Sequence, residues 1–215
     1  MDTFVPPRSS REKYLELLSE KFPTTRSAYT EIINLEAILN LPKGTEHFVS
    51  DVHGEFQAFE HILNNCSGVI RERVRSTFEF QLTTEEQADL CTLIYYPNMK
   101  LRRLREEGRL TGEWYAINLM RLVRLARRLS GTYTRSKVRK AMPVEYAYII
   151  DELLHTSSDE REERLAYHQR IISSIIDTGS ADDFICSLSS LIKRLAVDHL
   201  HLVGDIFDRG PRADL

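Results

Sequence analysis

The sequence lacks several features that would place it outside ordinary globular proteins. Its 215 residues include only 3 cysteines, without CxxC spacing, which argues against a disulfide framework and favours reduced thiols. No apolar run approaches the roughly 20 residues that a membrane-spanning helix requires. The first residues have neither the basic nor the apolar segment of a signal peptide. We therefore expect a cytoplasmic protein without a membrane span.

A marked excess of charge of one sign is also lacking. Lys and Arg number 29 against 32 Asp and Glu, and the resulting net charge of −3 favours neither nucleic acid nor an acidic membrane as a partner. No internal repeat and no low-complexity segment is present. Hydrophobic residues make up 42% of the chain, which at this length allows a substantial core.

Helical periodicity dominates what is present. Capping-box spacing at Ser9–Glu12 precedes an apolar stripe that ends before Pro23, and a second helix is predicted over about 25–39. Most of the segment 68–197 has the same apolar period. The helices predicted there include one opened by the capping-box spacing of Thr84–Gln87, one over about 114–129, one opened by Pro143, and two over about 159–177 and 182–195.

Two short apolar runs, His47–Val49 and Leu200–Val203, are predicted to be buried strands. Because the motifs that follow them must meet, we expect the strands to lie side by side and parallel. A parallel pair requires a crossover, which the helical segment 68–197 provides. The predicted fold class is α/β, helix-dominated overall, with parallel strands near 46–51 and 199–204.

An Asp-x-His motif follows the first strand. Asp51 and His53 stand two apart where the strand ends, so both side chains can reach one ion. A carboxylate with an imidazole suits Mn²⁺, Fe or Zn²⁺ better than Ca²⁺. Gly54 allows a tight turn, and the helix starting at Glu55 can present its first N–H groups to a phosphate. This short pattern alone also fits a capped turn with a surface histidine.

A longer motif, Gly-Asp-x-x-Asp-Arg-Gly over 204–210, follows the second strand. Asp205 can bridge two cations through its two carboxylate oxygens, as two-metal phosphoryl transfer requires. Arg209 offers a planar fork for phosphate oxygens, and Asp208 can orient a catalytic histidine or the arginine. The alternative, a turn with a surface Asp–Arg pair, is disfavoured by the length of the pattern.

Together the two motifs resemble the metal-binding loops of the calcineurin-type metallophosphoesterase superfamily. In the protein phosphatases of that superfamily the loops lie much closer in sequence than residues 51 and 205 do here. The stretch Glu31–Phe48, running into Asp51–Glu55, resembles the class III fructose-1,6-bisphosphatases of Firmicutes and related bacteria. A long helical insertion is also a trait of that family.

The resemblance implies a partial metallophosphoesterase core that hydrolyses fructose 1,6-bisphosphate to fructose 6-phosphate in gluconeogenesis, with two divalent ions, expected to be Mn²⁺. By position it implies Asp51 and His53 as ligands of the first metal and Asp205 as the bridging ligand. It implies Asp208 as an orienting catalytic residue and Arg209 as a catalytic phosphate ligand. The family's later Gly-Asn-His loop lies beyond residue 215, so we expect an N-terminal portion with little activity alone.

The motifs and periodicity divide the chain into three segments. Residues 1–67 hold the N-terminal helices and the first strand-loop-helix unit, 68–197 the helical insertion, and 198–215 the second strand with its metal loop. The basic segment 100–140 is a candidate site for an anionic effector, although a solvated helix face is the simpler interpretation. His199 and His201 are expected to pack within the fold rather than bind metal.

Two other functions remain open at this point. One is a different metallophosphoesterase, acting on proteins or dinucleoside polyphosphates, against which the long insertion and the Glu31–Phe48 stretch argue. The other is a non-catalytic helical interaction module with relic loops, against which the intact metal and phosphate motifs argue. No pattern indicates the oligomeric state.

Overall fold

The computed structural model describes residues 9–155 and 162–211, and the chain divides into two compact units, 1–42 and 43–215. The first unit holds α1 (Ser10–Lys21) and α2 (Thr25–Leu39), as predicted. The capping box at the start of α1 is formed. Ser9 Oγ accepts a hydrogen bond from the Glu12 N–H at 3.3 Å, and Glu12 Oε2 accepts one from the Ser9 N–H at 2.7 Å.

The apolar stripe predicted for residues 25–39 is a helix face that the first unit does not cover. Neither α1 nor α2 contains a buried residue. On α2 the side chains of Ile33 and Leu39 are 66% and 83% exposed. Tyr14 and Leu17 of α1 are similarly open, at 62% and 64%. Most helical stability comes from packing such a face, so this unit by itself has little to hold it together.

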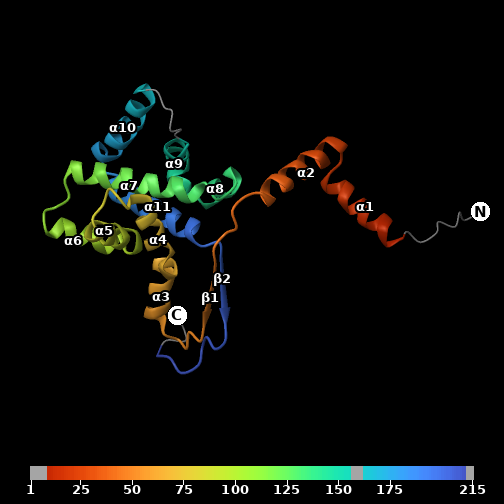
Figure 1. The fold of residues 1–215 in the computed structure, drawn as a ribbon, viewed down its shortest axis with the longest axis horizontal. Coiled ribbons are helices and arrows are strands. Elements are labelled where there is room, and N and C mark those ends of the chain that lie inside the picture. The colour runs from red at the N-terminus through yellow and green to blue at the C-terminus, as the bar shows by residue number, and fades with distance from the viewer. Residues whose placement is uncertain (1–8, 156–161, 212–215) are drawn as a thin grey trace, which may run out of the picture. The chain divides into compact units, whose positions relative to one another are not determined.

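The second unit begins with β1 (Glu46–Ser50), continues through a helical region and ends with β2 (His199–Val203) (Figure 1). The elements between the strands are α3 (Phe56–Asn65), the 3₁₀ turn η1 (Cys66–Gly68), α4 (Val69–Phe78), α5 (Thr84–Tyr95), α6 (Pro97–Glu106), α7 (Gly112–Ser130), α8 (Arg135–Ala141), the 3₁₀ turn η2 (Val144–Tyr146), α9 (Ala147–Leu154), α10 (Glu162–Asp177) and α11 (Ala181–Ala196). No described helix is both long and apolar enough to cross a membrane.

The two strands form a parallel pair, as predicted, and Figure 1 shows them side by side. The register runs from Glu46 opposite His199 to Ser50 opposite Val203. Both strands therefore end at the same edge of the sheet, where the two motifs follow. The helical region takes the place of the crossover that a parallel pair requires. The chain is thus helix-dominated with a small parallel sheet.

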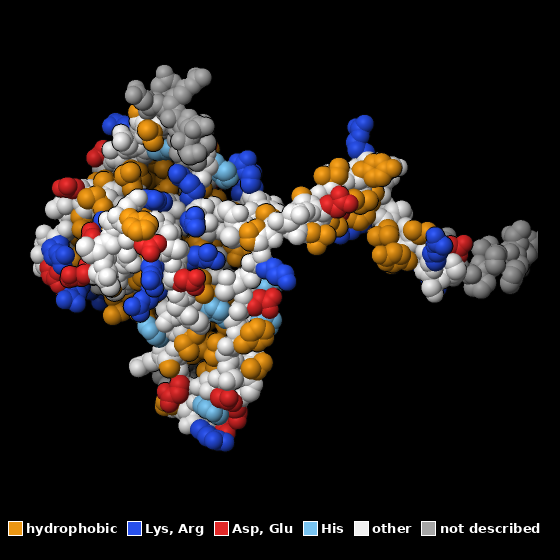
Figure 2. All heavy atoms as spheres, in the orientation of Figure 1, with side chains coloured by type: hydrophobic (Ala, Val, Ile, Leu, Met, Phe, Trp, Pro, Cys, Tyr) orange, Lys and Arg blue, Asp and Glu red, His pale blue; other side chains and the backbone are white. Residues whose placement is uncertain are grey.

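The prediction that both strands are buried is wrong for the described residues. Phe48 is 68% exposed and Val203 is 49% exposed. Figure 2 shows hydrophobic side chains along the surface of the strand region. The sheet among the described residues is two-stranded, and an apolar sheet face needs a second layer to be buried. The sheet therefore leaves apolar surface open to solvent.

The hydrophobic core lies in the helices between the strands. α7 and α11 pack against each other, and both contact further helices around them. Phe184 of α11 is fully buried and meets the ring of Tyr146 edge-on, with 5.1 Å between the ring centroids. The long amphipathic helix predicted over about 114–129 is α7, and it ends before Gly131 as expected.

Contacts at the start of β2 join this core to the sheet. The Asp198 N–H donates a hydrogen bond to the Thr45 carbonyl at 2.8 Å. The Asp198 carboxylate forms an ion pair with Lys137 of α8. On α3, the Asn64 side chain accepts a hydrogen bond from Lys193 Nζ of α11 at 2.9 Å. The helical region thereby fixes both ends of the strand-loop-helix arrangement that carries the motifs.

Two helix starts differ from the sequence prediction. Thr83, not Thr84, caps α5, and its capping-box partner is Glu86 at 2.9 and 3.2 Å. Both threonines suit a cap, but only this register gives the box an ionised acceptor. Pro143 opens the turn η2 rather than an α-helix, and α9 begins at Ala147. Of the helix predicted over 159–177, residues 159–161 lie outside the described part and α10 matches the rest.

Candidate metal centre

The hydrogen-bond ladder of the sheet continues into the loops that follow the strands. The His53 N–H donates to the Asp205 carbonyl at 3.2 Å, and the Gly54 N–H donates to the Ile206 carbonyl at 2.8 Å. These bonds hold together two motifs that are far apart in sequence. The predicted meeting of the Asp-x-His and Gly-Asp-x-x-Asp-Arg-Gly loops is therefore present in the fold.

Both loops need backbone conformations that side chains disfavour. Asp51, His53 and Arg209 have φ values of 51°, 49° and 69°. A non-glycine residue held there costs about 1 kcal/mol or more, and such residues concentrate at functional sites. At position 204 only glycine fits, because φ is 77° and a Cβ would lie 2.6 Å from Asp51 Oδ1. The fold therefore retains local strain at the residues that the sequence marks as functional.

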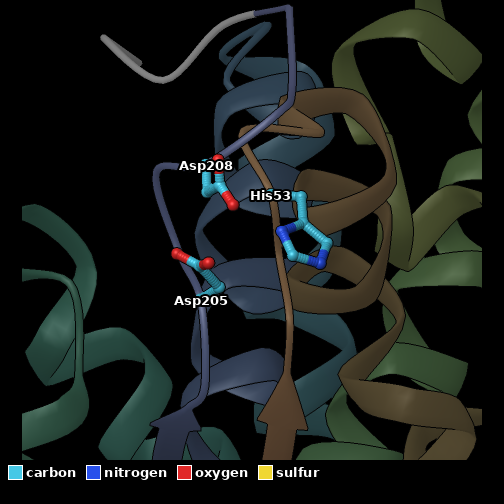
Figure 3. Close-up of side chains that lie close together, drawn as sticks. All are labelled: His53, Asp205 and Asp208. Carbon is cyan, nitrogen blue, oxygen red and sulfur yellow. The ribbon is translucent and has the colours of Figure 1, made fainter.

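His53, Asp205 and Asp208 converge at this edge of the sheet. One ligand atom from each lies within 4.8 Å of the others. Figure 3 shows a ring nitrogen of His53 turned toward the two carboxylates. His53 Nδ1 is buried and has no hydrogen-bond partner among the described residues, which leaves it available to a cation. An imidazole with two carboxylates is a donor set for a divalent transition metal.

Asp51 lies beside this cluster but makes a different contact. Its Oδ1 accepts a hydrogen bond from the Asp205 N–H at 3.3 Å. Asp208 lies within the cluster and also accepts the hydrogen bond from Arg209 Nε at 2.9 Å, so its orienting role stays a prediction. Sequence reasoning had no signal for the position of Asp208 beside His53, because the spacing of residues in a loop does not fix side-chain directions. The ligand role of Asp51 stays a prediction.

The surroundings of the Asp205 carboxyl group disfavour its ionisation. Desolvation raises the pKa of Asp205 above its usual value, and the hydrogen bond with Asp208 raises it further. The negative charges of Asp208 and Asp51 act in the same direction, whereas the charge of His53 lowers this pKa. Carboxylates held together in this way repel when both are ionised, so a bound cation would relieve the repulsion.

Arg209 extends from the same loop into solvent. Its side chain is 77% exposed, and its Nε donates a hydrogen bond to Asp208 Oδ2 at 2.9 Å. The guanidinium therefore keeps other N–H donors free to meet an incoming anion beside the cluster. The start of α3 lies at the same end of the sheet (Figure 1), and the side chain of Glu55 does not cap it. Its first N–H groups are consistent with the predicted contact to phosphate.

The strand histidines lie outside the cluster. The His201 ring stacks on Phe48 with 4.5 Å between centroids, and its Nε2 lies 3.2 Å from Glu46 Oε2. His199 stacks on His201 at 6.2 Å. The expectation that His199 and His201 pack within the fold is therefore wrong for the described residues, since their rings contact each other and Phe48 on an exposed face of the sheet.

The basic segment 100–140 is spread over α6, α7 and α8, and much of its charge is paired. Carboxylate partners are present for Lys100 (Asp89), Arg103 and Arg109 (Glu107), Arg105 (Asp182), Arg121 (Glu86), Lys137 (Asp198) and Arg139 (Asp151). This pairing favours the interpretation of ion-paired helix faces over a single binding patch. An effector site in this segment stays a prediction.

Comparison with known proteins identifies the family whose sequences contain these motifs. The sequence pattern of the family described as Firmicute fructose-1,6-bisphosphatase matches residues 13–215. The class 3 fructose-1,6-bisphosphatase of Porphyromonas gingivalis is 54% identical over 202 residues, which are 94% of this chain and 31% of that protein. The corresponding protein of Parabacteroides distasonis is 55% identical over 203 residues, 94% of this chain and 30% of that protein.

A protein of the same description from Clostridium beijerinckii is 53% identical over 203 residues. No solved structure matches the chain. The chain spans 30–31% of the length of these curated relatives. The match nevertheless runs through both motifs and the helical region between them, and the chain belongs to the Firmicute fructose-1,6-bisphosphatase family.

Proposed function

We propose that the centre formed by the two loops is part of a two-metal site that hydrolyses fructose 1,6-bisphosphate to fructose 6-phosphate and phosphate. The observation that carries this proposal is the convergence of His53, Asp205 and Asp208 in a member of this family. The parallel strands β1 and β2, with the site at their carboxyl edge, form part of a metallophosphoesterase core. In this proposal the core has three segments. Its first strand-loop-helix unit lies in 1–67, its helical insertion is 68–197, and its second strand and metal loop are 198–215.

The donor set of His53, Asp205 and Asp208 fits a divalent ion, for which we propose manganese. His53 and Asp205 would hold this ion, with Asp208 or the neighbouring Asp51 as a further carboxylate donor. Asp205 is the residue that we propose to share with the second ion of a two-metal site. When bound, the ions supply a hydroxide nucleophile at neutral pH and neutralise charge on the phosphoryl group.

The other residues of the loops bind and orient the substrate. Arg209 pairs with the phosphate oxygens, and its hydrogen bond to Asp208 at 2.9 Å fixes the direction of the guanidinium. The first N–H groups of α3 add donors for the same phosphate. Such fixed donors stabilise charge that develops during phosphoryl transfer without reorganisation at that moment.

The substrate class indicates where in the cell the reaction takes place. A sugar bisphosphate is a soluble metabolite, so we place the activity in the cytoplasm and, by the family's chemistry, in gluconeogenesis. The chain spans 31% of the Porphyromonas gingivalis relative, and we propose that it shows little activity without the remaining portion.

Membership of the family disfavours the alternative functions, in which the chain would be a phosphatase of proteins or of dinucleoside polyphosphates. A purely structural interaction module would not account for His53 Nδ1, which is buried and has no hydrogen-bond partner in the described part of the chain.

A chimera tests this function. In it the chain replaces the matching residues of the Porphyromonas gingivalis protein, and phosphate release from fructose 1,6-bisphosphate is measured with and without Mn²⁺. We expect Mn²⁺-dependent turnover that Asp205→Asn lowers on the order of a thousandfold, since it removes several kcal/mol of transition-state stabilisation. The exposed carboxylate of Asp177, at the end of α10, provides the matched control Asp177→Asn, which keeps full activity.

Two results would argue against the proposal. One is turnover of the chimera that persists in Asp205→Asn, which places the chemistry elsewhere. The other is a chimera that releases phosphate from a phosphoprotein or a dinucleoside polyphosphate in preference to the sugar bisphosphate.

A further inference from the structure

A groove between α7 and α10 shares no residue with the proposed metal centre. Its volume is about 800 Å³, within the range of pockets that hold small organic molecules. Residues of the α4–α5 turn and of α9 complete its lining. Figure 2 shows hydrophobic side chains gathered on the face of the helical region, with Lys and Arg side chains beside them.

The lining is largely apolar, from its base to its opening. Phe78, Val123 and Ile172 are buried at 2%, 6% and 6% exposure and belong to the core. Met120 and Leu165 line the same groove and are 57% and 52% exposed. Apolar surface that opens to solvent within a groove is the usual setting of a ligand site, whereas single exposed apolar residues need no explanation.

The charge of the lining has one sign among the described residues. α7 contributes Arg121, Arg124 and Arg127, spaced three residues apart, and no Asp or Glu belongs to the described lining. A second, smaller hollow of about 230 Å³ differs, since Glu86 and Asp89 line it together with its basic residues. The charged side chains that the described lining offers to a ligand are therefore basic.

The described contacts of the Arg124 guanidinium are with neutral groups only. Its Nη1 contacts the neutral amide oxygen of Gln81, and its Cζ lies 5.3 Å from the centroid of the Phe78 ring. These neutral partners hold the side chain in place without cancelling its charge. Arg121, by contrast, is paired with Glu86 at 3.1 Å. A guanidinium that neutral partners hold beside apolar surface, with no carboxylate partner among the described residues, suits one negative group on an apolar body.

We propose that this groove binds a small organic anion with an apolar chain, of the fatty-carboxylate class. The carboxylate pairs with Arg124, and the chain lies over Met120, Leu165 and Ile172. The site is independent of the proposed phosphatase function, because none of these residues belongs to the two metal loops.

Calorimetric titration of the 215-residue chain with decanoate and with 1-decanol tests the proposal. We expect decanoate to bind with 1:1 stoichiometry and the uncharged alcohol of equal chain length to bind on the order of tenfold more weakly. The methyl signals of Met120 and Ile172, followed by NMR in the same titration, should shift and report where the ligand lies.

Substitutions at solvent-exposed positions separate binding from folding. Arg124→Gln should weaken decanoate binding on the order of tenfold while leaving decanol binding unchanged. Leu165→Ser should weaken both ligands several-fold, because it removes apolar contact. Arg102 of α6 is exposed and lies outside the groove, so Arg102→Gln is the matched charge control and should bind both ligands as the unmodified chain does.

Three results would overturn the proposal. The first is no decanoate binding at millimolar concentration. The second is equal binding of decanoate and decanol, or equal loss in Arg124→Gln and Arg102→Gln, since the groove would then not recognise the charge. The third is methyl shifts confined to the exposed strands, around Val203, which would place the ligand on the sheet instead.

Discussion

Gly210 lies so close to His53 that a Cβ at position 210 would overlap the His53 carbonyl oxygen. The same Cβ would come within 2.6 Å of the carbonyl carbon of Gly54. The last glycine of the second motif is therefore required by the backbone of the first motif. This contact explains in physical terms why a glycine closes the Asp-Arg-Gly sequence next to the metal loop.

Gly210→Ala should therefore displace the His53 loop and weaken Mn²⁺ binding. Backbone cannot yield as a flexible side chain does, so we expect a loss on the order of tenfold or more in affinity. Mn²⁺ titration followed by electron paramagnetic resonance measures it. Gly131→Ala is the control, because its Cβ would meet nothing closer than 3.6 Å. Equal affinities in the two variants would show that the contact does not position His53.

Phe184→Ala should destabilise the second unit strongly. Its side chain is fully buried and packs edge-on against Tyr146, so we expect a loss of about 3–5 kcal/mol in the free energy of unfolding. Urea denaturation followed by circular dichroism measures this. Phe80 is 95% exposed, and Phe80→Ala should change the free energy by less than about 0.5 kcal/mol. Similar values for both variants would contradict a core built around α11.

Asp151 should make stability depend on pH. The hydrogen bond from Arg139, at 2.8 Å, and the charges of His155, Arg139 and Arg135 lower its pKa in the folded state, although desolvation opposes them. A lowered folded pKa means that the stabilisation is present above the unfolded pKa, about 4, and is lost as pH falls through the folded pKa. The charges act partly through solvent, so we expect only about 0.5–1 kcal/mol.

Urea denaturation of Asp151→Asn across pH measures this contribution. At pH 7 the variant should be less stable than the unmodified chain, and the difference should shrink as the pH falls below 4. Asp177→Asn, which removes an exposed carboxylate, should follow the unmodified chain throughout. A deficit in Asp151→Asn that is the same at pH 7 and at low pH would contradict the ion-pair explanation.

Local patterns in the sequence were sufficient to predict the helices that carry their own signals. The capping box at Ser9 and the apolar period of α7 depend on neighbouring residues, and both are confirmed. Thr83 and Thr84 suit a cap equally, so the register of α5 depended on which acidic or amide partner lay three residues on. The parallel pairing of β1 and β2 followed from requiring the motifs to meet, and it is confirmed as well.

Side-chain directions and burial could not be predicted in the same way. The exposure of Phe48 depends on whether a second layer covers the sheet, which no local pattern encodes. Within the site, Asp208 lies beside His53 and Asp51 accepts a hydrogen bond from the Asp205 N–H, and residue spacing specifies neither contact. The close approach of Gly210 to His53 likewise joins residues far apart in sequence, which no local pattern encodes.

Binding of a divalent metal by the two loops is measured by electron paramagnetic resonance of Mn²⁺ added to the 215-residue chain, to Asp205→Asn and to the control Asp177→Asn. We expect bound Mn²⁺ in the unmodified chain and in Asp177→Asn, and loss of the bound signal in Asp205→Asn. Identical spectra of free Mn²⁺ in all samples, or binding that survives Asp205→Asn, would contradict a metal centre formed by the two loops.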